Sequence, residues 1–331
     1  GEQVSAALIT LRLQENGCDA VALTGWQAGI VTDETYGNAK IIGVDPHLIT
    51  NHLLMGKVAV VAGFQGITPE GEITTLGRGG SDYTAKILER VLDADRLELF
   101  KEVPGVMSAD PKKVPGALQR MEITPRELLE LAKGGAKIVN PDCAWLIGDG
   151  GITYIRSVVH DVPGTLVVPI RQRRKNGFVT GIASSRAIEV SLLTTGTEHA
   201  TELFAKLGER DVSVDIVHVS ANEKTILFTT SERMLQQTKN VCEAFVEAHG
   251  GIIRERKIAV VRIVGEELQD AKGVFGEVLS ILEEMGISNP LTPTSEITIS
   301  VVVPEDREEE VVRLLHRRLI EEKEIPVSDS E

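Results

Sequence analysis

The segment that most constrains the fold of this chain is a glycine-rich loop at residues 74–82, T-T-L-G-R-G-G-S-D. It follows the apolar run 57–64 and leads into 81–92, where apolar residues recur with the spacing of a helix. Glycines between a strand and a helix let the backbone approach a bulky anion, and the first turn of the helix adds unpaired N–H groups. We therefore expect the loop to bind a phosphate or a carboxylate.

Two charged residues of this loop fit the same interpretation. Arg78 offers a fork of donors that suits either anion, and Asp82, in the first turn of the helix, can orient a cationic group or a bound amino group. The alternative is an ordinary turn with a surface arginine and a helix-capping Ser81-Asp82 pair, because such loops are weakly specific when taken alone. The surrounding sequence is needed to distinguish an anion-binding loop from an ordinary turn.

Length and charge narrow the class of protein. A chain of 331 residues predicts two or three domains, and its 42% hydrophobic content is enough for sizeable cores. The formal net charge of −14 argues against nucleic acid or an anionic membrane surface as the main partner, since both would repel the chain. A small metabolite is the expected ligand.

The cysteines and the hydropathy pattern indicate a cytoplasmic protein. Cys18, Cys143 and Cys242 are odd in number and widely spaced, so they predict neither a disulfide framework nor a zinc site. We expect no protein-bound metal. No run approaches the roughly 20 apolar residues that span a bilayer, and no signal peptide is visible.

Residues 1–170 alternate between strand and helix patterns. This alternation predicts an α/β domain with a doubly wound sheet and a ligand over the carboxyl edge of its strands. The expected strands are 20–23, 58–64, 97–100, 153–157 and 164–167, and the expected helices are 3–16, 45–56, 81–92 and 124–134.

Beyond a basic run at 171–177, which we interpret as a solvated linker, the chain repeats itself. Two copies of a β-α-β-β-α order predict two ferredoxin-like βαββαβ modules, at 178–256 and 257–325. The second copy lacks a closing strand, which the segment 178–182 could supply. The first copy has strands 188–193, 212–220 and 225–230 and helices 198–209 and 232–249; the second has strands 258–264, 287–292 and 297–303 and helices 274–285 and 307–320.

Taken together, these segments resemble the aspartate kinases (aspartokinases), which are amino-acid kinases with C-terminal ACT modules. The resemblance covers nearly the whole chain. Besides the glycine-rich loop, the matching stretches are G-E-Q-V-S from Gly1, T-G-W-Q-A-G-I from Thr24, G-N-A-K-I from Gly37, V-A-G-F-Q-G from Val61, V-P-G-V-M-S-A-D-P-K from Val103, G-A-K from Gly135 and T-S-E-I-T-I-S from Thr294.

The resemblance implies transfer of the γ-phosphate of ATP, with Mg²⁺, to the side-chain carboxylate of L-aspartate. The product would be 4-phospho-L-aspartate, at the entry to lysine, threonine and methionine biosynthesis. The residues agree with this chemistry, because a carboxylate nucleophile is already ionised at neutral pH and needs no strong base. What such a site needs instead is cationic and N–H groups that hold two anions together.

The family's site residues can be carried over wherever the motifs match. Glu2 and Arg78 would bind the ammonium and a carboxylate of aspartate, with Ala28, Gly29, Gly79 and Gly80 lining the same subsite. The implied catalytic residues are Arg78, Asp82 and Lys137, although Lys137 could also be a solvated lysine after a helix end. The implied ATP contacts are Lys101, Glu102, Met107, Lys112, Lys137 and Ile138.

The ACT modules imply regulation by lysine, threonine or both, and assembly into a homo-oligomer. An effector would lie at the interface of two modules, and the residues expected to bind it are Asp215, Thr294, Ser295 and Glu296. The alternative for these residues is that they are ordinary solvent-facing strand ends.

Several positions depart from the family pattern. The usual Thr-Asp is Lys101-Glu102, the usual aromatic residue is Met107, an arginine is replaced by Lys112, and a histidine or serine by Asn140. The Lys-Phe-Gly-Gly loop that binds phosphates in the family does not occur, so we expect the true N-terminus to lie upstream of Gly1 and the chain as given to bind ATP poorly. The alternative function is a kinase-impaired, amino-acid-sensing regulatory subunit; a kinase acting on glutamate or a nucleotide is disfavoured by the duplicated modules.

Overall fold

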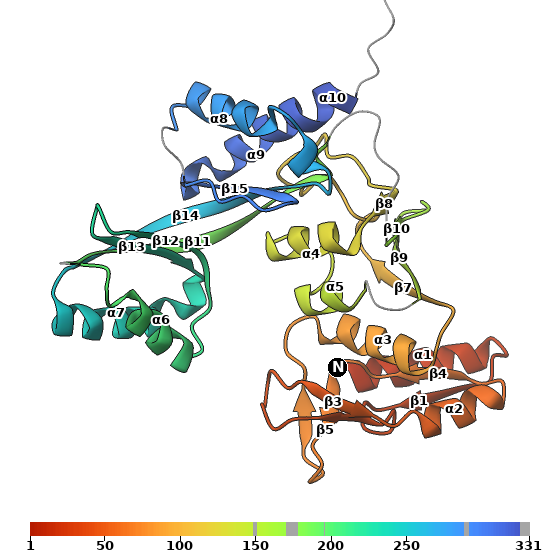
Figure 1. Ribbon diagram of the computed structural model, residues 1–331. Coiled ribbons are helices and arrows are strands. Elements are labelled where there is room, and N and C mark those ends of the chain that lie inside the picture. The colour runs from red at the N-terminus through yellow and green to blue at the C-terminus, as the bar shows by residue number, and fades with distance from the viewer. Residues whose placement is uncertain (148–150, 170–177, 195, 288–290, 325–331) are drawn as a thin grey trace, which may run out of the picture. The chain divides into compact units, whose positions relative to one another are not determined.

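The structure, a computed structural model, describes residues 1–147, 151–169, 178–194, 196–287 and 291–324 (Figure 1). It divides into two compact units, Gly1–Met107 with Leu118–Arg173 and Ser108–Ala117 with Arg174–Glu331. The expected linker at 171–177 lies outside the described residues. None of the described helices is both long and apolar enough to cross a membrane.

The first unit alternates helices and strands, which confirms the α/β class. Parallel pairing joins β1 to β4, β2 to β5, β7 to β9 and β8 to β10, but it is distributed over three sheets, ordered β1-β4, β3-β2-β5-β6 and β7-β9-β10-β8. The elements are α1 (Glu2–Glu15), β1 (Ala20–Leu23), β2 (Ile30–Thr32), β3 (Ile41–Val44), α2 (His47–Leu54), β4 (Val58–Val61), β5 (Gln65–Ile67), β6 (Ile73–Thr75), α3 (Gly80–Val91), β7 (Arg96–Lys101), β8 (Glu122–Ile123), α4 (Pro125–Lys133), α5 (Pro141–Ile147), β9 (Ile152–Ser157) and β10 (Thr165–Val167).

Local sequence signals fix the helices that border the glycine-rich loop. Helix α4 begins with a complete capping box between Thr124 and Glu127, with Pro125 in the first turn, as the sequence predicts. Leu88 of α3 and Leu92, the C-cap residue of this helix, pack against a small core of Leu23, Ala28, Ile30 and Ile49. The C-terminal end of α3 is thereby held against β1 and β4.

A buried ion pair lies on α3. Lys86 Nζ is 2.7 Å from Glu89 Oε2, and the two side chains are 1% and 4% exposed. The backbone N–H of Gly151 donates to the other carboxylate oxygen of Glu89 at 2.6 Å. Because a buried charge without a partner is costly, each member of this pair depends on the other.

The second unit is built on one antiparallel sheet of five strands, ordered β12-β13-β11-β14-β15. Its strands are β11 (Gly181–Leu193), β12 (Val214–Ser220), β13 (Thr225–Thr230), β14 (Ile252–Val264) and β15 (Thr298–Pro304); its helices are α6 (Ala200–Glu209), α7 (Leu235–His249), α8 (Val274–Glu284), α9 (Glu308–His316) and α10 (Glu322–Glu324). Short 3₁₀ turns occupy Glu232–Met234, Leu268–Asp270 and Glu305–Arg307, and a π-helical turn occupies Arg317–Glu321.

Two ferredoxin-like modules share this sheet because β11 and β14 each serve both. Strand β14 pairs with β11 over the full thirteen residues, from Gly181 against Val264 to Leu193 against Ile252. Three residues of β11, Ile188, Val190 and Leu192, pack in a hydrophobic core with α6 and α7. Ile182 lies on the same face of the strand, because side chains alternate between faces, but it packs in a second core with α8 and α9. The two helix pairs lie at the two ends of the sheet (Figure 1).

Two strand predictions need correction. The segments 178–182 and 188–193, predicted as two strands, are joined, because residues 181–182 begin the single strand β11 that continues through 188–193. The pairing of Gly181 and Ile182 with β14 confirms that the first segment pairs with the second module. The predicted strand 287–292 is wrong for its described residues, which carry no strand assignment. The backbone nevertheless runs beside β15, since Val302 donates to the carbonyl of Leu291 at 3.0 Å and Ser300 to that of Pro293 at 2.9 Å. Pro293 cannot donate a ladder hydrogen bond, which limits regular pairing there.

A strap of ten residues, Ser108–Ala117, packs into the second unit although it interrupts the sequence of the first. Ser108 Oγ lies 2.7 Å from Nε2 of the fully buried His316, whose Nδ1 lies 2.7 Å from Glu321. Lys113 forms an ion pair with Glu308 and donates to Ser184 Oγ at 2.9 Å. These contacts anchor the strap to α9 and β11.

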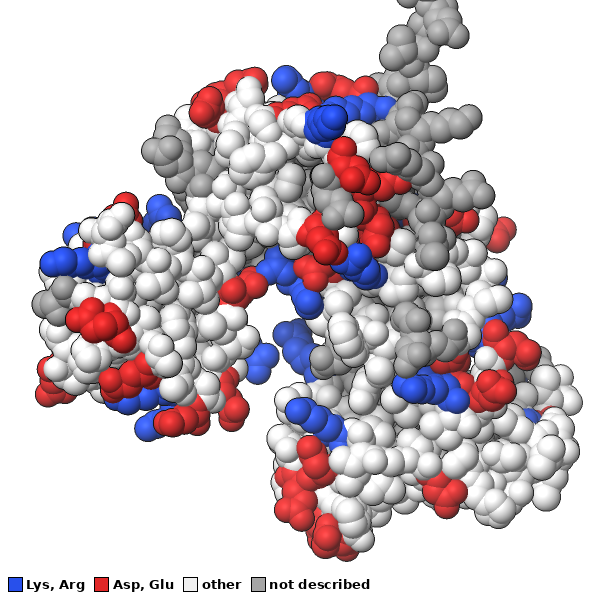
Figure 2. All heavy atoms as spheres, in the orientation of Figure 1, with Lys and Arg blue, Asp and Glu red and all other residues white. Residues whose placement is uncertain are grey.

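Charged residues of both signs are interspersed on the face shown in Figure 2. This distribution differs from the continuous basic surface of a nucleic-acid-binding protein.

We predict that Lys86→Met lowers the free energy of unfolding of the first unit by about 3–5 kcal/mol, because Glu89 would remain buried without its partner. The double variant Lys86→Met/Glu89→Gln removes both charges and should recover most of this loss. Denaturant unfolding followed by circular dichroism measures the effect; a single variant as stable as the parent would contradict it.

The strap should be less stable in acid. Burial alone would raise the pKa of Glu308, but hydrogen bonds from Lys113 and Ser184 and the charge of Lys113 outweigh it and hold the pKa below its ordinary value of 4.5. A depressed carboxyl pKa gives stability that is present above the unfolded pKa and lost as the pH falls through the folded one. Lys113→Met should therefore cost roughly 1–3 kcal/mol at pH 7, and this cost should shrink below pH ~4.5.

Thermal unfolding from pH 7 to pH 3 checks this prediction. Lys112→Met, a change of the exposed neighbour in the same strap, is the control and should cost less than about 0.5 kcal/mol at every pH. A Lys113→Met penalty that does not depend on pH would refute the role given to Glu308.

Candidate functional site

The glycine-rich loop connects β6 to α3 and is closed by two asparagines from distant segments. Gly77 and Gly79 have φ values of 76° and 74°, which L side chains rarely adopt. A Cβ on Gly79 would lie 2.5 Å from Cβ of Asn140, and a Cβ on Gly77 would overlap Oδ1 of Asn38. Asn140 Nδ2 donates to the backbone carbonyl of Arg78. The side chain of Asn38, in the G-N-A-K motif, and that of Asn140, three residues after the G-A-K motif, thus pack closely against the backbone of the loop.

The connection between β4 and β5 is fixed to the N-terminal part of α3. Phe64 has a φ of 72°, which is unusual for a residue with a side chain. Its N–H donates to Thr84 Oγ1 at 3.1 Å, and its carbonyl accepts from the N–H of Leu76 at 2.9 Å. Thr84 Oγ1 in turn donates to the carbonyl of Gly80 at 2.8 Å. Both sides of the loop are held by the same turn of helix.

The N-terminus of α3 is suited to an anion. Its N-cap is Gly79, and no side chain of the described residues caps this end of the helix. The backbone N–H groups of a first helical turn lack partners inside the helix and lie at the positive end of its dipole. A phosphate or carboxylate could occupy this position.

Asp82 and Lys101 form an ion pair beside this turn. Lys101 Nζ lies 2.6 Å and 2.7 Å from the two carboxylate oxygens of Asp82, and the side chains are 23% and 17% exposed. Lys101 is an implied ATP contact and Asp82 an implied catalytic residue. The sequence analysis did not predict that the two side chains form an ion pair. Lys101 balances the charge of Asp82, so Asp82 repels an approaching anion less than a lone carboxylate would.

A cavity of about 460 Å³ lies between α1, β4 and the first turns of α3. Its polar lining comes from Glu2, Ser5, Ser81 and Thr84, and Gly63 and Val61 close it on the side of β4. Glu2, expected to bind the ammonium of aspartate, therefore shares a cavity with Ser81, the neighbour of Asp82. Arg78, Asp82 and Lys137 do not line this cavity.

The remaining implied residues of the first unit lie in different environments. Ala28 is fully buried in the core, and Gly29, with a φ of 78°, has no room for a Cβ against the backbone of Asp45. Both positions are therefore closely packed, and their place in the aspartate subsite stays a prediction. Arg78, Lys137 and Glu102 are exposed, Ile138 is half-buried, and Met107 forms an isolated bridge with Gln119. Lys137 lies three residues before Asn140, which binds the glycine-rich loop.

Lys112 and the expected effector residues lie in the second unit. Lys112 is exposed in the strap, where its backbone N–H donates to Asp110 Oδ1 at 2.9 Å. Asp215, on β12, forms an ion pair with Arg262 of β14, so its carboxylate already has a cationic partner. Residues 294–296 are exposed in a turn before β15, in which the backbone N–H of Ser295 donates to the carbonyl of Thr298 at 2.9 Å.

Comparisons with known proteins agree with this organisation. The amino acid kinase family model matches residues 1–157, and an ACT domain model matches residues 261–319. Aspartokinase 2 of Bacillus subtilis (strain 168) is 38% identical over 324 residues, which cover 96% of this chain and 79% of the relative. An aspartokinase of Thermus thermophilus is 34% identical over 327 residues, covering 96% and 80%.

Solved structures give the same result. E. coli aspartokinase III in complex with aspartate and ADP (R-state) superimposes with a TM-score of 0.80 at 26% identity, covering 96% of this chain and 74% of that one. The same enzyme in complex with lysine and aspartate (T-state) gives a TM-score of 0.73 at 27% identity, covering 97% and 74%. Because the chain is 38% and 34% identical to two aspartokinases and covers 79% and 80% of their lengths, it belongs to the aspartokinase family.

Proposed function

We propose that the first unit transfers the γ-phosphate of ATP to the side-chain carboxylate of L-aspartate at the N-terminus of α3. The observation that carries this proposal is the convergence of three segments distant in sequence on residues 77–82, through Asn38, Asn140 and the Asp82–Lys101 pair. In support, a related structure, that of E. coli aspartokinase III, is a complex with aspartate and ADP.

Aspartate would be bound by charge at both of its ends. Arg78, exposed at the loop, would pair with a carboxylate, and Glu2, in the cavity beside Ser81, would pair with the ammonium. The side-chain carboxylate, with an ordinary pKa near 3.9, is ionised at neutral pH and needs no general base. This fits a site in which we assign no catalytic histidine or cysteine.

In the transfer step, one aspartate side-chain oxygen forms a bond to the γ-phosphorus, and the bond from that phosphorus to the β,γ-bridging oxygen breaks. ADP leaves with the bonding electron pair. Lys137 and the N–H groups of α3 would neutralise the charge on the migrating phosphoryl group. Glu102, Met107 and Ile138 would contact the nucleotide, and Lys112 is the implied contact from the strap.

Mg²⁺ would arrive on the nucleotide, because magnesium at such sites is held mainly by phosphate oxygens and water. Both carboxylate oxygens of Asp82 bind Lys101, so we do not assign Asp82 as a metal ligand. No step is derived through the ion.

The second unit would regulate the first. We propose that both ferredoxin-like modules are ACT modules that bind lysine, threonine or both, and that they join chains into a homo-oligomer; the matched ACT model and the lysine complex of a relative support this. The residues that would bind the effector are Asp215, whose carboxylate is paired with Arg262, and Thr294, Ser295 and Glu296 in the exposed turn before β15. We place the reaction in the cytoplasm, where ATP and free aspartate are available.

We predict that the full-length gene product forms an acyl phosphate from ATP and aspartate, trapped as the hydroxamate. Arg78→Ala and Lys137→Ala should each lower kcat/KM by about 10²–10³-fold, as expected for the loss of one charge-stabilising group. Lys133→Ala, which changes an exposed lysine one turn earlier, is the control and should stay within about twofold, as surface changes usually do.

Two outcomes would contradict the proposal. If Arg78→Ala and Lys137→Ala leave kcat/KM unchanged, the site lies elsewhere. If the parent protein forms no hydroxamate yet binds lysine or threonine, the alternative of a regulatory subunit without kinase activity is favoured.

The packing of the loop gives a second prediction. Gly79→Ala should reduce activity by about 100-fold, because its Cβ would displace Asn140 and move the first turn of α3, and displacements of about 1 Å have such effects. Gly71→Ala is the matched control, since Gly71 also has a positive φ, of 98°, but has no neighbouring atom within 4 Å of a built Cβ. It should keep its activity while losing about 1 kcal/mol of stability. Equal loss of activity in both variants would contradict the role of the Asn140 contact.

A further inference from the structure

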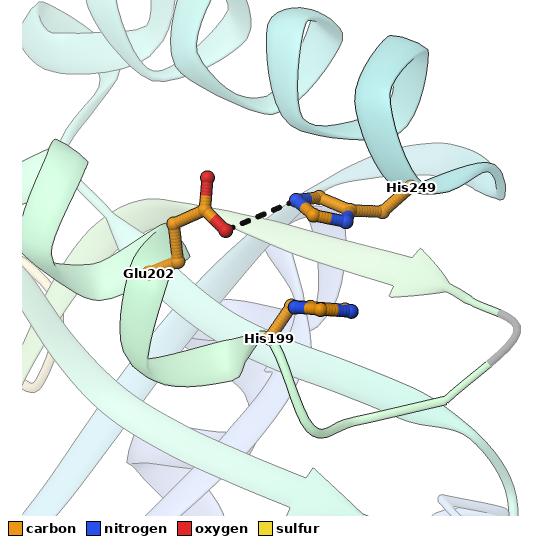
Figure 3. A group of neighbouring side chains, drawn as sticks. All are labelled: His199, Glu202 and His249. Atoms are coloured by element: carbon orange, nitrogen blue, oxygen red, sulfur yellow. Dashed lines mark hydrogen bonds and ion pairs between the residues drawn. The ribbon is translucent and has the colours of Figure 1, made fainter.

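Three metal-ligating side chains converge in the first ferredoxin-like module, away from the kinase site. His199 is the N-cap residue of α6, Glu202 lies in the first turn of the same helix, and His249 is the last residue of α7 (Figure 3). One possible ligand atom from each side chain lies within 4.8 Å of those of the other two. Among the described residues, this is the group of His, Cys, Asp and Glu side chains that lie close enough together to hold one metal ion. Neighbouring helix ends thus bring together residues 50 positions apart.

Aromatic packing holds the two imidazoles in place. The rings of His199 and His249 are stacked, with centroids 4.1 Å apart and an interplanar angle of 22°. The His249 ring also contacts Phe245, with a centroid distance of 4.8 Å. Its side chain is only 20% exposed, so its orientation is set by packing before any ligand binds.

The carboxylate of Glu202 is oriented toward the histidines. Its Oε2 lies 3.1 Å from Nε2 of His249, while its Oε1 lies 2.6 Å from Nζ of Lys206, one turn further along α6. Lys206 thereby leaves Oε2 on the side of the imidazoles, as Figure 3 shows for the Glu202–His249 contact. Metal-binding carboxylates are commonly positioned by such an outer hydrogen bond.

The distances suit a small transition-metal ion. Zinc binds imidazole nitrogen at about 2.0–2.1 Å and carboxylate oxygen at about 2.0–2.2 Å, which places tetrahedral ligands roughly 3.3–3.5 Å apart. The Glu202–His249 distance of 3.1 Å is close to this value, and a ligand atom of His199 lies within 4.8 Å of both groups. Because the lone pair of an imidazole nitrogen lies in the plane of the ring, the exposed His199 ring has to rotate out of its stack with His249 to bind the same ion. A fourth position would be open to water.

We propose that His199, Glu202 and His249 form a binding site for one divalent zinc-type ion. Two imidazoles and a carboxylate favour zinc over magnesium or calcium, which prefer all-oxygen ligands. The ion joins the N-terminus of α6 to the C-terminus of α7. The dipole of α6 disfavours a cation at its N-terminus, whereas the dipole of α7 favours a cation at its C-terminus, so the two effects largely offset each other. The carboxylate of Glu202 supplies negative charge for the ion.

This ion acts as a clamp on the module. It binds the folded arrangement and not the separated helices, so the free energy of unfolding rises with the logarithm of the ion concentration once that concentration exceeds the dissociation constant. The site is independent of the aspartokinase chemistry, and its occupancy is measurable without substrates.

The test uses chelator-treated protein and Zn²⁺ alone, in isothermal titration and in thermal unfolding, with Co²⁺ absorption as a probe of geometry. We expect one Zn²⁺ per chain, a raised thermal midpoint and the intense visible bands of tetrahedral Co²⁺. His199→Phe and His249→Phe keep an aromatic ring without a ligand nitrogen, and each should weaken Zn²⁺ binding by at least about 30-fold. Mg²⁺ should not compete.

His218→Ala, which removes an exposed histidine from β12 of the same module, is the matched control and should bind Zn²⁺ like the parent. Thermal midpoints without Zn²⁺ show that the phenylalanine variants are folded. The site would be rejected if the parent binds no Zn²⁺ at micromolar concentration, or if the double variant His199→Phe/His249→Phe binds it with the parent's stoichiometry and affinity.

Discussion

The candidate site depends on how closely two asparagine side chains approach a glycine backbone. Asn38 and Asn140 occupy the space that side chains at Gly77 and Gly79 would need, and Asn140 also binds the carbonyl of Arg78. This steric constraint joins segments that lie about 40 and 60 residues from the loop in sequence. It also fixes where α3 begins, and hence where its unpaired N–H groups lie. Arg78, Asp82 and the segment of Lys137 are placed by the same packing.

Part-buried ion pairs play a similar role in both units. In the first, Lys101 and Asp82 place opposite charges beside the start of α3. In the second, Lys113 and Glu308 hold the strap against α9, helped by Ser184. The strap continues the V-P-G-V-M motif, whose first residues pack in the first unit around Thr165. One stretch of sequence therefore supplies both an implied nucleotide contact and a structural part of the second unit.

Local signals were enough to predict some elements, whereas the misses involve partners distant in sequence. Strand β13 and the start of α4 follow from β-branched alternation and a capping box. Strand β11 was divided because Ser184 and Arg186 interrupt its apolar pattern; they are polar because they bind Glu308, more than 120 residues away. The Asp82–Lys101 pair was missed for a similar reason, although the replacement of the family's Thr-Asp by Lys101-Glu102 was a usable signal. The histidine cluster joins two helix ends whose spacing follows no metal motif.

Phosphoryl transfer at this site requires both reactants to meet at the first turn of α3. A crystal structure of the protein with L-aspartate and ADP is the sharpest test of this requirement. We expect an aspartate carboxylate on Arg78 and nucleotide phosphates near the N–H groups of Ser81 and Asp82. Density for both ligands without any contact to residues 77–82 would contradict it, even if the protein proved to be an active kinase.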